Sequence, residues 1–158
     1  MRAVDPDLFR EALKKFATGV TVITTAHEGE KHGLTASSFA SVSLEPPLIL
    51  VVLNTESRTH ALLTHSNIFG VSILGEEHAD IARAFAEKGT KPFDSVAHRS
   101  TERGVPVLED AIGWLECEVE STFPGGTHQI VIGRVLSCGS SAGDPLIYFE
   151  RNYRSLNE

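Results

Sequence analysis

The first twenty residues carry an apolar stripe at helical spacing. Its members stand at positions i, i+3, i+4 and i+7: Phe9, Ala12, Leu13 and Phe16. Asp5 and Pro6 stand just before the stripe, and an Asp cap followed by Pro is a typical helix start. The pattern predicts a helix with one apolar face that runs from Pro6 to near Ala17.

After this helix the pattern changes to short runs of β-branched and aliphatic residues between turn residues. Such runs predict strands at 20–25, from 33 onward, at 48–53 and at 68–74, with a hairpin turn at 27–30. Two further helices are predicted: a short one capped by Thr55 or Ser57 and ending near His65, and one over 78–88 that Gly89 ends. We expect the polar stretch 90–104 to be an irregular, mobile surface loop.

The last third of the chain predicts strands only. Leu115, Cys117 and Val119 alternate with glutamates, which predicts a half-buried strand with an acidic outer face. A turn at 124–127 and strands at 128–136 and 146–149 follow. About seven strands with three short helices do not form a β-α-β series, and neither a Gly-rich dinucleotide motif nor a Walker loop occurs. We therefore predict a mainly β fold, an antiparallel barrel with a few peripheral α-helices, as one domain over residues 1–158.

Composition restricts the partners of the protein. The formal net charge of -7 argues against nucleic acid, because phosphate backbones bind to basic faces. The longest aliphatic run, 48–53, is too short to span a bilayer, and the N-terminal region has no apolar signal segment. The two cysteines form no Cys-x-x-Cys motif, which favours buried, reduced thiols. We expect a cytoplasmic protein with no nucleic-acid and no membrane partner.

The histidines and serines do not form a metal-binding or hydrolase motif. His60 and His65 are five residues apart, which places them on different faces of a helix. His27 and His32 flank a turn, without a cluster of carboxylates or thiols to complete a site. No Gly-x-Ser-x-Gly elbow is present either. We expect neither a metal site nor a serine hydrolase.

The segment 33–59 carries the most informative chemistry. Hydroxyl residues stand among apolar ones at Thr35-Ala36-Ser37-Ser38, and a buried strand leads to Asn54-Thr55-Glu56-Ser57-Arg58-Thr59 at a helix start. Free backbone N–H groups at a helix N-terminus attract anions, and Ser, Thr and Arg side chains add donors. This pattern predicts a site for a planar, phosphorylated cofactor, with an ordinary helix cap as the alternative.

His128 follows a Gly-Gly turn at the start of an apolar strand. That location predicts a position at the rim of the barrel. A histidine there can be a positioned donor beside a cofactor or a proton relay. The alternative is a surface or capping histidine.

Several motifs together identify a family. They are the segments 16–22, 33–39 and 41–43, Pro46-Pro47, Ser57-Arg58-Thr59, Phe85, Phe93, Gly126-Thr127-His128, Gly133, Tyr148 and Tyr153-Arg154. With them the chain resembles, over nearly its whole length, the flavin reductase-like family. These NAD(P)H:flavin oxidoreductases serve as small components of two-component flavin-dependent monooxygenases. The central motif with the proline pair is the specific part of the resemblance.

The resemblance implies a split β-barrel of the Greek-key, FMN-binding type that works as a homodimer, with a flavin near the subunit interface. It implies that the flavin ring edge or ribityl chain meets Thr35, Ala36, Ser37 and Ser38. The residues that would hold the chain and the phosphate are Asn54, Thr55, Ser57, Arg58 and Thr59. Phe93 would border the cofactor, and His128 with Tyr153 would seat the nicotinamide. This chain departs from many relatives at Thr127, where they have Asp, and at 148–153, which lacks a glycine often found there.

The implied activity is hydride transfer from NADH or NADPH to FMN or FAD. The reduced flavin would then diffuse to a flavin-dependent oxygenase. Backbone N–H groups around 36–38 are the candidates for stabilising negative charge on the flavin, and His128 would position the dinucleotide. The alternatives are a non-enzymatic flavin-binding sensor or carrier, and an oxidase of the pyridoxamine-phosphate type, which calls for more basic residues. The sequence does not decide between FMN and FAD or between NADH and NADPH, and it does not identify the oxygenase.

Overall fold

The computed structural model describes residues 2–157, and most of its regular structure is strand. Strands take up 47% of the chain, about twice the share in an average globular protein, and the described residues contain three helices. The predicted mainly β fold is therefore confirmed. In chain order the elements are α1 (Pro6–Leu13), β1 (Thr18–Gly19), β2 (Thr21–His27), β3 (Glu30–Ala36), β4 (Phe39–Ser43), β5 (Leu48–Asn54), α2 (Arg58–Ser66), β6 (Ile68–Ile73), α3 (Ala79–Ala86), β7 (His98–Ser100), β8 (Pro106–Leu108), β9 (Gly113–Gly125), β10 (His128–Ser140), β11 (Ile147–Phe149) and β12 (Asn152–Arg154).

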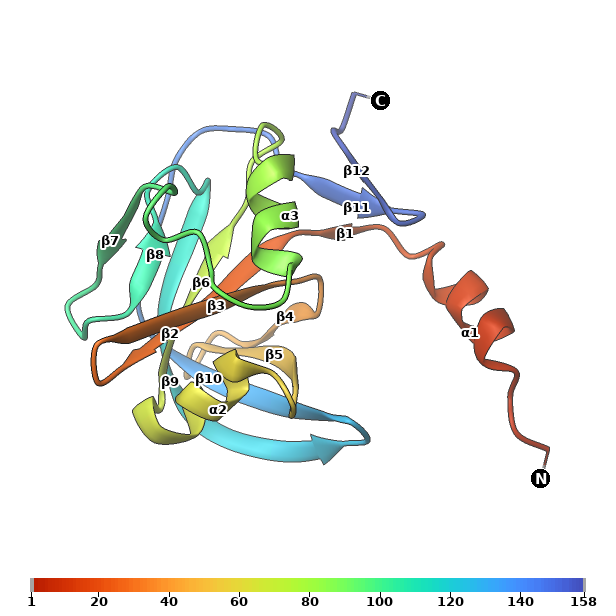
Figure 1. The fold of residues 1–158 in the computed structure, drawn as a ribbon, viewed down its shortest axis with the longest axis horizontal. Coiled ribbons are helices and arrows are strands. Elements are labelled where there is room, and N and C mark those ends of the chain that lie inside the picture. Colours follow the sequence, from red (N-terminus) through yellow and green to blue (C-terminus); the bar gives the residue numbers. More distant parts are fainter. Residues whose placement is uncertain (1, 158) are drawn as a thin grey trace.

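Seven strands form one antiparallel sheet in the order β3-β2-β6-β9-β10-β5-β4. Laid flat, such a sheet would hold its two edge strands about 29 Å apart. The edge strands β3 and β4 are joined only by Ser37 and Ser38, and a connection of that length reaches about 11 Å. The sheet therefore curls until its two edges approach each other at this connection (Figure 1).

Tight turns set the register of the two main hairpins. Glu28 and Gly29 have positive φ angles of 49° and 83°, as a two-residue turn between twisted strands requires, and they join β2 to β3. The predicted turn at 27–30 is confirmed. Gly126, with a φ of 64°, and Thr127 join β9 to β10. The second turn brings the start of β10 to the end of β5.

Two apolar clusters fill the interior. The first lies within the curled sheet, where Leu53, Phe69 and Val131 are fully buried. The second lies under α3, whose Ala82 and Phe85 pack against apolar residues of β2 and β8. Full burial of a Leu or Phe side chain contributes about 1.5–3 kcal/mol, so these clusters hold both the curl of the sheet and the position of α3.

Helix α1 starts where its cap predicts. The Asp5 carboxylate accepts the N–H of the second following residue at 2.8 Å, and the helix begins at Pro6. It ends at Leu13, short of the predicted Ala17. The reason is the pairing of β1 with β11, which requires extended backbone from Thr18.

Of the other two helices, α2 follows its predicted cap and α3 does not end where it was predicted to end. The Ser57 hydroxyl accepts an N–H of the first turn of α2 at 3.1 Å, which confirms one of the two predicted caps. Helix α3 is shorter than the predicted 78–88, because Glu87 already has extended backbone. Gly89, with a φ of 97°, lies in the loop beyond the helix end.

Two predictions for the second half of the chain were wrong. The stretch 90–104 is not irregular throughout, because β7 lies in it and pairs with β8. Glu116 does not face the solvent and is only 2% exposed. Its carboxylate accepts the N–H of Arg103 at 3.1 Å and the hydroxyl of Ser137 at 3.3 Å, and these bonds satisfy the buried group. The short strands β8 and β12 were not predicted.

Helix α1 stands away from the sheet, beyond β11 and β12 (Figure 1). Its predicted apolar stripe is open to solvent, with Phe9, Leu13 and Phe16 exposed by 57%, 56% and 77%. Despite this stripe, none of the helices described in residues 2–157 is both long and apolar enough to cross a membrane.

Candidate functional site

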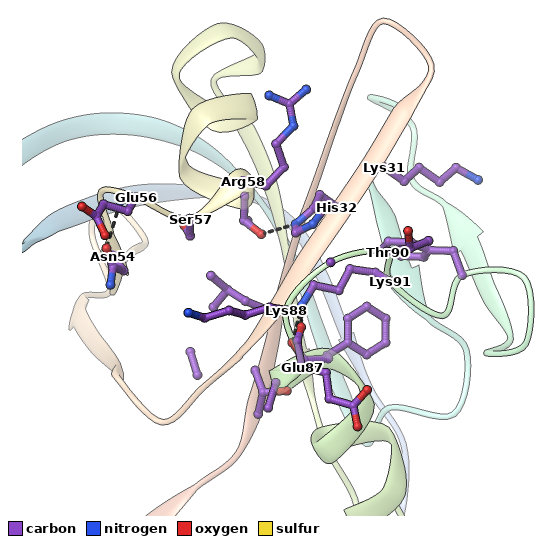
Figure 2. Close-up of a pocket in the computed structure, with 18 of the residues that line it drawn as sticks. Lys31, His32, Asn54, Glu56, Ser57, Arg58, Glu87, Lys88, Thr90 and Lys91 are labelled. Atoms are coloured by element: carbon purple, nitrogen blue, oxygen red, sulfur yellow. Dashed lines mark hydrogen bonds between the residues drawn. The ribbon is translucent and has the colours of Figure 1, made fainter.

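An open cleft of about 1640 Å³ lies beside the connection between the two edge strands of the sheet. It is bordered by β3, by the start of α2, and by the loop that follows α3 (Figure 2). Ten of the residues predicted to contact a cofactor or substrate line it: Thr35, Ala36, Ser37, Ser38, Asn54, Ser57, Arg58, Thr59, Phe93 and His128. The fold thus brings distant parts of the sequence to one place.

The end of β3 and the connection after it form a wall of hydroxyl residues. The Thr35 hydroxyl donates to the carbonyl of Ala82 in α3 at 2.6 Å, and the Ser38 hydroxyl donates to the carbonyl of Val52 in β5 at 3.1 Å. Both protons are therefore used within the protein, and the two oxygens keep lone pairs for a ligand. Ser37 is exposed and can turn its hydroxyl as donor or acceptor.

The N-terminal turn of α2 borders the cleft on the other side. Asn54 and Ser57 both line it, and the Asn54 amide oxygen accepts the N–H of Glu56 at 2.9 Å. The remaining N–H groups of the first turn are donors that an anion can use. Thr55 does not line the cleft, because its N–H and its hydroxyl both donate to the carbonyl of Thr127, at 3.2 and 3.1 Å. A direct cofactor contact of Thr55 stays a prediction.

Arg58 is held by a carboxylate of the neighbouring strand. Its guanidinium forms two hydrogen bonds with Glu30 of β3, at 2.7 and 2.5 Å. These bonds lower the pKa of Glu30 and raise the pKa of Arg58. In Figure 2 the Arg58 side chain extends away from the centre of the cleft. An anion bound at the start of α2 therefore competes with Glu30 for this guanidinium.

Two lysines of the loop after α3 also line the cleft. Figure 2 shows Lys88 reaching toward the side formed by Asn54 and Ser57. Lys91 instead turns its amine to carbonyl oxygens at the end of α3, one of them at 3.0 Å. Burial lowers the pKa of Lys91. Lys88 is thus the lysine placed to meet a ligand at the start of α2.

His32 of β3 bonds to the buried first turn of α2. Its Nδ1 lies 2.9 Å from the hydroxyl of Thr59, which is fully buried. Burial, followed by the positive charge of Lys91, lowers the pKa of His32. The bond between His32 and Thr59 therefore ties β3 to α2 at the border of the cleft.

The two aromatic residues predicted for the site lie in different places. Phe93 lines the cleft and packs edge-on against Phe85 and His98, with ring centroids 5.3 and 5.2 Å apart. Tyr153 lies in β12 outside the cleft, beneath the guanidinium of Arg83 at 5.4 Å from its ring centroid, and burial raises its pKa. A nicotinamide contact of Tyr153 stays a prediction.

His128 lies at the end of the cleft formed by the β9–β10 hairpin. It is the first residue of β10, it pairs with Asn54 of β5, and it is half-buried. Its Nδ1 is 2.8 Å from the hydroxyl of Thr127. The ring therefore stands near the N-terminus of α2, where a ligand held there could contact its other nitrogen. Its role stays a prediction.

Glu30 and His32 are among the polar residues of the cleft that sequence reasoning missed. Both lie on β3, on the strand that leads to Thr35. The sequence signal that could have indicated both residues is their closeness to Thr35 along the chain. This signal was not decisive, because Glu30 and His32 make their contacts with α2, and the sequence does not show where α2 packs.

The cleft combines features that suit a planar ligand with a phosphate. It has a hydroxyl-bearing wall, an aromatic border at Phe93, and a helix N-terminus with Lys88 beside it. Its volume exceeds the about 300–1,000 Å³ of ordinary small-molecule sites, which leaves room for a second ligand. The residues present thus fit a flavin together with part of a dinucleotide.

Comparison with known proteins identifies the family. The sequence model of the flavin reductase like domain matches residues 13–157. The chain belongs to this family. Among its flavin reductase relatives, the "NADH-dependent flavin reductase StyB" of Pseudomonas fluorescens is 41% identical over 154 residues, which cover 95% of this chain and 89% of that protein.

Other members of the flavin reductase family are similar to this chain over comparable lengths. The "Flavin-dependent monooxygenase, reductase subunit HsaB" of Mycobacterium tuberculosis is 35% identical, covering 97% of this chain and 83% of that protein. The solved structure of "Streptomyces globisporus C-1027 NADH:FAD oxidoreductase SgcE6 in complex with NAD and FAD fragments" is 34% identical, with a TM-score of 0.90 over 98% of this chain and 96% of that one. The antiparallel fold described above is thus the fold of this family.

Proposed function

We propose that the protein is an NADH-dependent flavin reductase that supplies reduced flavin to a monooxygenase component. The observation that carries the proposal is the cleft itself, in which the hydroxyl wall, the start of α2, Lys88 and His128 meet. Membership of the flavin reductase family and relatives described as NADH-dependent support it. FMN and FAD both carry the phosphate that the start of α2 can bind.

The task of the chain would be to bind a flavin and a reduced nicotinamide in the same cleft. A bound flavin supplies the hydride acceptor, and the reduced nicotinamide supplies the hydride, so no covalent nucleophile of the protein is needed. The start of α2 and Lys88 would hold the phosphate, and Thr35 and Ser38, which line the cleft, would contact the flavin. Backbone N–H groups around 36–38 would stabilise negative charge on the acceptor. His128 would orient the nicotinamide, and water that enters the open cleft would supply the proton that completes the reduction.

The same open cleft supports release of the reduced product. Its lining residues come from β3, from the start of α2 and from the loop after α3 (Figure 2). A flavin that is a substrate has to leave after each turnover. Relatives that are named as reductase components of monooxygenases support transfer of reduced flavin to a separate oxygenase.

We further propose that the protein works as a homodimer through α1. Exposed apolar stripes of this kind mark interaction surfaces in folded proteins. Phe9 and Leu13 form such a stripe on α1, which stands away from the sheet, and the exposed Phe16 follows shortly after the end of the helix (Figure 1). A second copy is the occupant that we assign, because a two-fold pair buries two such stripes at once.

The first experiment measures consumption of NADH and of NADPH by the purified protein with added FMN, FAD or riboflavin. We expect oxidation of NADH that depends on flavin, and the rates across the three flavins give the preferred acceptor. Anaerobic assays with cytochrome c as the electron acceptor confirm that reduced flavin leaves the protein. No flavin-dependent oxidation, in a protein that retains flavin through purification, would establish a binding or sensing module instead.

A further inference from the structure

The Thr127 side chain contacts the ring of His128 at the mouth of the cleft. Its Oγ1 lies 2.8 Å from His128 Nδ1, a normal length for a hydrogen bond. Nδ1 is therefore occupied within the protein. Nε2, on the far side of the ring, is the nitrogen that remains for a ligand in the cleft that His128 lines.

Thr127 is itself fixed by Thr55, the residue that follows β5. The backbone N–H and the hydroxyl of Thr55 both donate to the carbonyl of Thr127, at 3.2 and 3.1 Å. The next residue, His128, pairs with Asn54 in the ladder between β10 and β5. The β9–β10 turn is thus held from two sides against the loop that opens α2. The turn that carries His128 and the loop that opens α2 are therefore bonded directly to each other.

A hydroxyl beside Nδ1 can either donate to the ring or accept from it. The lone pair of a neutral imidazole is far more basic than a hydroxyl oxygen, so the stronger arrangement has the hydroxyl donating. The proton of the neutral ring then resides on Nε2, because the tautomer is set by the bond that the other nitrogen makes. A carboxylate at position 127 could only accept, and it would enforce the opposite tautomer.

We infer that Thr127 is a positioning residue that makes His128 an Nε2–H donor toward the cleft. Thr55 holds the backbone of Thr127 in the place where its hydroxyl meets the ring. The acceptor is a carbonyl oxygen, which we assign to the carboxamide of the nicotinamide. This assignment rests on the proposed reductase function, whereas the state of the ring does not. His128 acts in this arrangement as an oriented donor, and it transfers no proton.

The state of the ring is tested by NMR of the protein without added flavin or dinucleotide. Nitrogen chemical shifts of the His128 ring distinguish the two neutral tautomers at about pH 8.5, where imidazoles are ordinarily uncharged. We expect the Nε2–H form in the unaltered chain and in Thr127→Ser, and the Nδ1–H form in Thr127→Asp. An Nδ1–H ring in the unaltered chain, or no change in Thr127→Asp, would overturn the inference.

Kinetics test the consequence for the dinucleotide. Thr127→Val and Thr127→Asp should raise the KM for NADH about tenfold, the effect of losing one oriented hydrogen bond, while the affinity for FMN changes less than twofold. Thr127→Ser keeps the hydroxyl, and its KM for NADH should therefore equal that of the unaltered chain. Thr122→Val removes another hydroxyl from the same hairpin, and the KM should not change.

Equal KM values in all four variants, in a chain that oxidises NADH, would refute the positioning role and leave the reductase function intact. An unaltered chain that shows the predicted ring state without oxidising NADH would instead refute the reductase function.

Discussion

The carboxylate of Glu30 and the guanidinium of Arg58 bind each other through two hydrogen bonds at the edge of the cleft, at 2.7 and 2.5 Å. The pair links β3 to the first turn of α2, where an anion is expected to bind. Glu30 therefore both orients Arg58 and neutralises part of its charge. Which effect dominates decides how Arg58 contributes to ligand binding.

We expect Glu30→Gln to strengthen the binding of FMN about threefold at low salt. The substitution frees the guanidinium for the phosphate, and the modest size follows from the exposure of this ion pair. Riboflavin, which has no phosphate, should bind with unchanged affinity. Fluorescence titrations of both flavins measure the difference. Glu28→Gln removes a charge from the same hairpin without touching Arg58 and is the control. Weaker FMN binding in Glu30→Gln would show that orientation of Arg58 matters more than its free charge.

Lys88 gives a second test of the phosphate position. Because its side chain reaches toward Asn54 and Ser57, Lys88→Met should weaken FMN binding about tenfold and leave riboflavin binding within twofold. Arg103→Met removes one exposed positive charge outside the cleft and controls for net charge. Equal loss of affinity for both flavins would contradict a phosphate contact, because it would point to a change in the shape of the site.

The apolar stripe of α1 predicts the oligomeric state. Phe16 is 77% exposed within one chain, so we expect it to be buried against a second copy. Phe16→Glu would place a charge in that interface, and light scattering after gel filtration should then report a monomer where the unaltered chain is a dimer. Glu11→Lys changes the charge on the opposite face of the same helix, and this variant should remain dimeric. A monomeric unaltered chain would refute the proposal.

Local chemistry was enough to predict most of the fold. Asp5 with Pro6 started α1, the Ser57 hydroxyl capped α2, and β-branched runs marked the central strands. Each of these signals depends on residues a few positions apart. The confirmed start of α2 is also the part of the candidate site that sequence reasoning located best.

Features that depend on distant partners could not be predicted. Glu116 fits an alternating pattern as an outward residue, and it is buried only because Arg103 and Ser137 supply donors from other parts of the chain. The bond of His32 to Thr59 has the same origin, since it forms only once α2 packs over β3. Alternation along one strand carries no information about such contacts. The burial of Glu116 and the bond of His32 thus depend on contacts between residues far apart in the sequence, which the local pattern does not predict.

The buried thiol of Cys117 predicts how stability depends on alkaline pH. Burial, helped by the negative charge of Glu116, raises the pKa of Cys117 from 9.0 to about 12. The folded chain therefore keeps the proton that the unfolded chain loses above about pH 9. The contribution of Cys117 to the free energy of unfolding is complete below that pH and is lost between about pH 9 and 12, by about 1.4 kcal/mol per pH unit.

Urea denaturation at several pH values between 8.5 and 11 measures this slope. Other groups also titrate in this pH range, so the test compares the slope of stability against pH between the variants. Cys117→Ala should lower stability at all pH values by loss of packing, and it should also make the alkaline decline less steep. Cys138→Ala, at the exposed cysteine, should leave the slope unchanged. A thiol reagent should modify Cys138 alone in the folded chain and both cysteines after unfolding. Equal slopes in the two variants would show that Cys117 does not carry the effect.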